Sequence, residues 1–141
     1  MRAFLLLTLL LTGCVSQPHE PVPTDVVRIN LDTMRPGDHL SAYRLDGELV
    51  QGLRFDDIPP GEHELQVRYR YESSARASAS GLLGDIQRRS CILAVYYDGF
   101  EAGYEYRLVV NQLGWSTVGW LESSSGESLA SARVLRCGPG V

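Results

Sequence analysis

The sequence predicts an all-β fold, a small antiparallel β-sandwich or barrel-like domain of about eight short strands. Two observations predict it. After residue 25, most segments alternate apolar with polar side chains, and glycine, proline, asparagine or aspartate recurs between them about every eight to twelve residues. No long stretch has the apolar spacing of a helix, so we expect no long helix in this domain.

The N-terminus has the features of an export signal. One basic residue, Arg2, precedes an apolar run over residues 4–11, and small residues stand just before Cys14. The run is too short to span a bilayer, which takes about 20 apolar residues. We therefore expect residues 1–13 to be removed as a signal peptide. An ordinary signal peptide, in which Cys14 has no role, is the alternative.

The four residues Leu11-Thr12-Gly13-Cys14 resemble the lipobox of bacterial lipoproteins. The resemblance implies a diacylglycerol on Cys14, the first residue after cleavage, and no other cofactor is expected. Because Val15 is not the aspartate that favours the inner membrane, it also implies an outer-membrane location. The next residues, 14–24, contain three prolines and form an extended tether. Residues 25–141 then form the domain, which we expect in the periplasm.

The strands are expected where the alternation is regular. In chain order they cover residues 26–31, 40–45, 48–55, 64–72, 91–97, 104–110, 115–121 and 129–137. Asp46-Gly47 predicts a tight hairpin between the second and third of these. The fourth has the clearest alternation and the fifth is almost wholly apolar, which predicts a central strand covered on both faces. Residues 73–90 lack a strong pattern and are expected to form a loop, with one possible helical turn over 82–88.

Two cysteines remain once Cys14 carries the lipid. In the oxidising environment outside the cytoplasm, Cys91 and Cys137 are expected to form one disulfide. Reduced structural thiols or a metal site are the alternatives. No histidine or cysteine spacing supports a metal site.

Charge and motifs argue against several functions. The chain has 13 basic and 17 acidic residues, a net charge of −4, so it does not favour nucleic-acid binding. No catalytic motif is present, and we expect no enzyme activity. An envelope hydrolase is the weakest hypothesis, because it would need Asp56, Asp57 and His63 to form one pocket.

Aromatic residues supply the candidate binding positions. Tyr96 and Trp120 are each out of phase with the other large side chains of their strands. Because one phase of a sandwich strand faces the core and the other faces outward, one of the two is expected to line a surface groove. Tyr71 is the third candidate, since tyrosine and tryptophan dominate protein-binding hot spots.

Two wider resemblances suggest what such a domain does. Arg44-Leu45-Asp46-Gly47 followed by residues 58–67 is similar to PEGA-type repeats, which are small β-modules of envelope proteins and not enzymes. The size, lipobox, tether and β-pattern together resemble the β-type pilotin lipoproteins of type III secretion. The second resemblance implies a protein partner, the C-terminal segment of a secretin subunit. The first implies a structural module that contacts peptidoglycan or a small ligand.

Overall fold

The computed structural model describes residues 18–74 and 86–141. The signal peptide, the lipobox and Cys14 lie outside the described residues. The described part contains nine strands and no helix, so the predicted all-β fold is confirmed. The strands are β1 (Arg28–Thr33), β2 (His39–Leu45), β3 (Glu48–Leu49), β4 (Gly61–Ser74), β5 (Ile86–Phe100), β6 (Glu105–Leu113), β7 (Ser116–Ser123), β8 (Ser128–Ser131) and β9 (Arg133–Gly138). Within these ranges, no helix is long and apolar enough to cross a bilayer.

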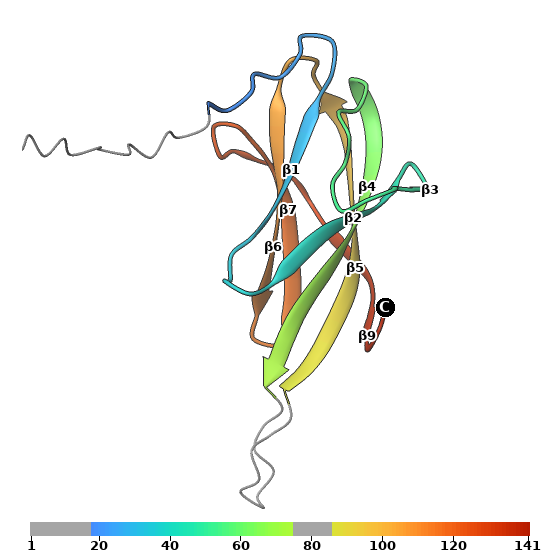
Figure 1. The fold of residues 1–141 in the computed structure, drawn as a ribbon, viewed down its shortest axis with the longest axis vertical. Coiled ribbons are helices and arrows are strands. Elements are labelled where there is room, and N and C mark those ends of the chain that lie inside the picture. The colour runs from blue at the N-terminus through green and yellow to red at the C-terminus, as the bar shows by residue number, and fades with distance from the viewer. Residues whose placement is uncertain (1–17, 75–85) are drawn as a thin grey trace, which may run out of the picture.

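The strands form two sheets that pack as a sandwich (Figure 1). One has the order β1-β6-β7-β8 and the other β3-β2-β4-β5-β9. The sheets are called here the four-stranded and the five-stranded sheet. Every strand pair is antiparallel except β1 and β6, which run parallel. The parallel pair arises because the chain leaves β1, builds β2 to β5 in the opposite sheet, and only then returns.

The core lies between the inward rows of the two sheets. Leu65, Val67 and Tyr69 of β4 each have an exposed fraction of 1% or less, as the alternation of this strand predicts. Leu108 and Leu121 face them from the four-stranded sheet and are fully buried. Burial of these apolar side chains is the main stabilising contribution to such a fold.

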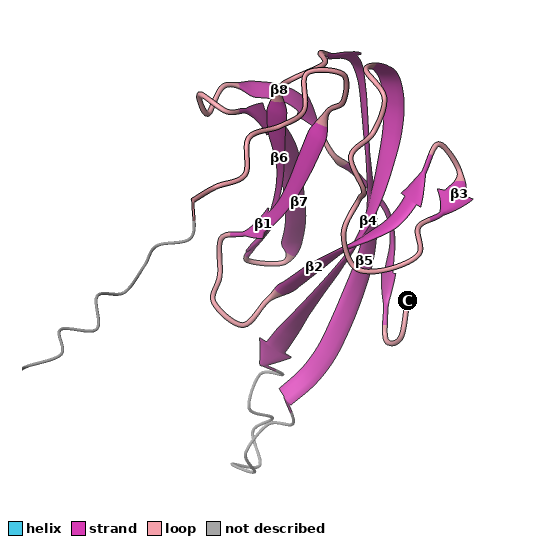
Figure 2. Cartoon of the chain, turned by 45° about the horizontal axis from the view of Figure 1, so that its top comes forward, coloured by secondary structure: helices cyan, strands magenta, loops and turns pink. Residues whose placement is uncertain are grey.

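The last expected strand, residues 129–137, is divided between the sheets. It pairs with β7 as β8 and with β5 as β9, and Ala132 lies between the two (Figure 2). At this crossing the Ala132 amide donates to the Gly119 carbonyl at 2.8 Å. A Cβ atom on Gly119 would lie 3.1 Å from that of Ala132, so the absence of a side chain lets the strand cross here.

Three expected elements differ from those observed. Only Glu48–Leu49 of the expected strand 48–55 is a strand, since Gly52 has a φ of +117°, which most residues avoid. The expected loop 73–90 is shorter, because β4 and β5 pair out to Ser74 and Ile86. Residues 86–88 of the suggested helical turn therefore belong to β5, held by cross-strand pairs such as Glu72 with Arg88. Residues 82–85 lie outside the described part.

The predicted disulfide is present. Cys91 of β5 lies directly opposite Cys137 of β9, and their Cα atoms are 4.1 Å apart. The bond joins a fully buried residue to an exposed one on the outermost strand. Such a bond indicates an oxidising location outside the cytoplasm.

Two residues assigned to the tether contact the domain. The His19 ring lies 2.8 Å from a carboxylate oxygen of Glu105, and Arg28 Nη1 donates to the Glu20 carbonyl at 2.9 Å. The tether therefore reaches the domain beside β1 of the four-stranded sheet (Figure 1).

Candidate functional site

The structure places the three predicted aromatic residues on three different parts of the surface. Tyr96 points outward from the five-stranded sheet and is 52% exposed. Trp120 points outward from the four-stranded sheet and is partly buried. Tyr71 lies near the end of β4, stacked on Tyr69 with ring centroids 5.2 Å apart. No single groove contains all three.

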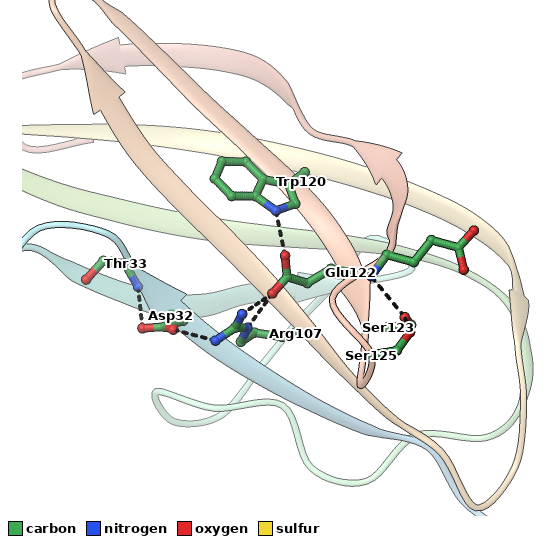
Figure 3. Close-up of polar contacts among 8 residues, drawn as sticks. Asp32, Thr33, Arg107, Trp120, Glu122, Ser123 and Ser125 are labelled. Atoms are coloured by element: carbon green, nitrogen blue, oxygen red, sulfur yellow. Dashed lines mark hydrogen bonds and ion pairs between the residues drawn. The ribbon is translucent and has the colours of Figure 1, made fainter.

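Trp120 is part of a polar network on the outer face of the four-stranded sheet (Figure 3). Its indole N–H donates to Glu122 at 2.9 Å, and Arg107 Nε donates to the same carboxylate at 2.6 Å. Arg107 also contacts Asp32 of β1 at 3.3 Å. The network joins β1, β6 and β7, so Trp120 here has a structural role.

Glu122 is the buried group of this network, with an exposed fraction of 7%. The Trp120 N–H and the Arg107 guanidinium stabilise its charged form, and together they outweigh burial and lower the pKa of Glu122. The folded state therefore binds this proton less readily than the unfolded chain does.

A pH dependence of stability follows from this lowered pKa. The stabilisation is complete above the ordinary glutamate pKa near 4.5 and is lost as the pH falls through the lower folded value. Glu122→Gln is expected to cost about 1–2 kcal/mol at pH 7, a low value because Arg107 is solvent-screened. The cost should shrink below pH 4 in urea titrations of both proteins. An equal cost at pH 7 and pH 3 would contradict this assignment.

The residues of the hydrolase hypothesis are held apart by other partners. Asp57 accepts Nε and Nη2 of Arg28 at 3.1 and 3.0 Å. His63 contacts Asp46 at 2.6 Å and the Pro59 carbonyl at 2.8 Å. Across residues 18–74 and 86–141, no three histidine, cysteine or acidic side chains group as metal ligands would.

The surface best suited to bind a protein lies at one end of the sandwich. Three large apolar side chains are exposed there, Met34 by 61%, Leu113 by 58% and Trp115 by 86%. They come from the loop after β1 and from the β6–β7 hairpin, which lie near one another (Figure 1). The Met34 amide donates to Val110 O, which fixes that loop beside β6. This surface, with Tyr71, is called the Trp115 end.

Two open clefts lie at the Trp115 end and share Tyr71. One, of about 400 Å³, is lined by Trp115, Tyr71 and the arginines Arg35 and Arg89. The other, of about 420 Å³, lies on the far side of the same tyrosine and includes Glu72. Tryptophan, tyrosine and arginine are the residues most enriched at the energetic centres of protein interfaces.

Local geometry explains why Trp115 is exposed. Leu113 pairs with Ser116, so the loop of the β6–β7 hairpin contains only Gly114 and Trp115. Gly114 has a φ of +58°, as the first position of a type II′ turn requires. Trp115 thus stands at the tip of the hairpin. The sequence analysis placed it inside a strand, although Gly-Trp between two alternating segments is a signal for this turn.

No protein-family model, no curated protein and no solved structure matches this chain. The candidate site therefore depends on the geometry of the described residues.

Proposed function

We propose that this chain is a non-enzymatic outer-membrane lipoprotein that holds a protein partner at the membrane through its Trp115 end. The observation that carries the proposal is the exposure of Trp115, Met34 and Leu113 together at one end of the domain. Large exposed apolar groups cost solubility, and contiguous ones mark interaction sites. The flanking arginines give the site a polar rim, as protein interfaces have.

The lipobox and the disulfide support the location. Leu11-Thr12-Gly13-Cys14 stands directly after an apolar export segment, and the disulfide is compatible with the periplasm. Residues 15–24 then separate the lipid from the domain. An anchored domain with one exposed binding end is suited to hold a partner rather than to transform a substrate.

In its most concrete form, the proposal is a pilotin of type III secretion. The partner is then the C-terminal segment of a secretin subunit. Apolar side chains of that segment pack against Trp115 and Tyr71, while its acidic groups meet Arg35 and Arg89. The pilotin carries the bound subunit to the outer membrane.

The test is a binding titration with residues 15–141, which contain both sheets and the disulfide. The probes are synthetic peptides from the C-terminus of the secretin encoded in the same genome. We expect Trp115→Ala to weaken binding by about 30-fold, a typical hot-spot effect. Leu53→Ala is the matched control: Leu53 is 73% exposed, lies in the segment after β3, and should leave binding unchanged. Thermal unfolding of both variants checks that the fold is kept.

Two results would overturn this proposal. Absence of binding to any such peptide, with normal secretin assembly in a deletion strain, would remove the pilotin function. Unchanged fractionation of Cys14→Ser with the outer membrane would remove the lipid anchor.

The exposed Tyr96 favours a second candidate, a PEGA-like module that contacts peptidoglycan. Glu62 hydrogen-bonds this phenol and raises the pKa of Tyr96. An aromatic ring beside a carboxylate can pack on a sugar and accept its hydroxyl protons. Retention on isolated peptidoglycan, lost in Tyr96→Ala and kept in Trp115→Ala, would favour this function over the pilotin.

A further inference from the structure

The outer face of the five-stranded sheet carries a band of arginines without carboxylates. The register defines three adjacent rows across β2, β4, β5 and β9. They are Ser41-Arg68-Ile92-Arg136, His39-Arg70-Ser90-Gly138 and Arg44-Gln66-Ala94-Arg133. The rows hold five arginines, one histidine and no acidic residue. This set of residues is called the arginine band.

Acidic residues on this face lie beyond the band. Glu64 and Glu72 belong to the rows on either side, and Glu72 pairs with Arg88 at 3.7 Å. No carboxylate among the described residues forms an ion pair with the five arginines of the band. By contrast, Arg28 and Arg107 of the other sheet are both paired with carboxylates. The band is thus a positive area on a chain whose net charge is −4.

Side-chain packing fixes the position of the arginines. Ile92 and Ala94 are 1% and 5% exposed although they point outward, because their neighbours in the rows lie over them. Arginine stems cover apolar surface in this way while the charged heads face water. The sequence analysis expected this strand to be covered on both faces. On the outer face, side chains of the same sheet provide the cover, with no third layer.

Tyr43 organises the centre of the band. It is the bulged residue between the paired Ala42 and Arg44. The guanidinium carbons of Arg68 and Arg44 lie 4.8 and 5.2 Å from its ring centroid, and Arg136 donates to its hydroxyl at 3.5 Å. The Nε–H of Arg68 is buried and has no acceptor among the described residues. Three cations are thus held around one ring.

We propose that the arginine band binds the phosphate groups of an anionic phospholipid surface, so that the five-stranded sheet lies against the membrane. Guanidinium groups bind phosphate oxygens in pairs of hydrogen bonds. The five arginines are spread over four strands in two dimensions, as the phosphates of a headgroup layer are. An acidic peptide would offer carboxylates along one line. The binding does not depend on a lipid at Cys14.

Vesicle binding by residues 15–141 tests this proposal without any anchor. The probes are vesicles of 30% phosphatidylglycerol in phosphatidylcholine and vesicles of phosphatidylcholine alone. A basic residue near an anionic surface increases binding about fivefold, so Arg70→Gln/Arg133→Gln should weaken binding to the first about 25-fold. Both residues are exposed, so the variant should fold. Raising the salt from 0.05 to 0.5 M should also weaken binding.

The matched control removes the same charge elsewhere. Arg35→Gln/Arg54→Gln lies outside the band, and its vesicle binding should change less than threefold. Equal binding to both vesicle types, an equal loss in the control, or binding of polyglutamate without binding of anionic vesicles would each overturn the proposal.

Discussion

Replacing Cys91 and Cys137 together by alanine is expected to lower the free energy of unfolding by about 4 kcal/mol. The bond spans 46 residues, and the chain-entropy relation gives this value for a loop of that length. Domains of this kind have total stabilities of about 5–15 kcal/mol, so the loss is a large share. It corresponds to a fall in melting temperature on the order of 15 °C. Alanine suits Cys91 because the site is fully buried and a serine hydroxyl there would need a partner.

The control is the unchanged protein with and without reductant. Reduction alone should lower stability by a similar amount, since it opens the same loop without changing side-chain volume. Urea titration of the three samples measures the effect. A loss below 1 kcal/mol in both would mean that β9 is held by its hydrogen bonds to β5 without help from the bond.

Leu108→Ala is expected to cost about 2–5 kcal/mol. Leu108 is fully buried in β6, between Leu31 of the parallel strand β1 and Leu121 of β7. Removal of its side chain leaves a cavity where three strands face the opposite sheet, and paired strands cannot easily move to fill it.

Leu113→Ala provides the comparison within the same strand. Leu113 is the last residue of β6 and is 58% exposed, so this substitution should change stability by less than about 0.5 kcal/mol. Chemical denaturation of both variants gives the difference. Similar losses at the two positions would show that burial along β6 is not as described.

The sequence alone predicted the strands whose pattern depends on burial. The alternation over 64–72 marks the buried face of β4, and the apolar run 91–97 marks a strand with neighbours on both sides. Asp46-Gly47 forms the expected hairpin between β2 and β3, with φ values of +49° and +86° at the two residues. These features are local, so a short window of sequence contains their cause.

Other features depend on residues far apart in the chain. Alternation shows that residues 28–33 form a strand but not that their neighbour is β6, about 75 positions later, in parallel. Nor does it show that one segment crosses between sheets at Ala132, since that depends on Gly119.

The candidate site was predicted only in part for a related reason. Strand phase identified Tyr96 as an outward residue, and its exposed ring agrees with that. Phase could not show that Trp120 has Glu122 as a partner, or that Trp115 stands in a turn. The arginine band was also missed, because it assembles only when four strands align.

The crossing at Ala132 bears on when the domain can fold during export. Residues 128–138 supply an outer strand to both sheets, and the partner of Cys91 lies in the same segment. Neither sheet is complete until this segment has passed through the inner membrane. The chain therefore stays open, and accessible to chaperones and proteases of the periplasm, until translocation is nearly finished. Disulfide formation then marks the end of folding and not its beginning.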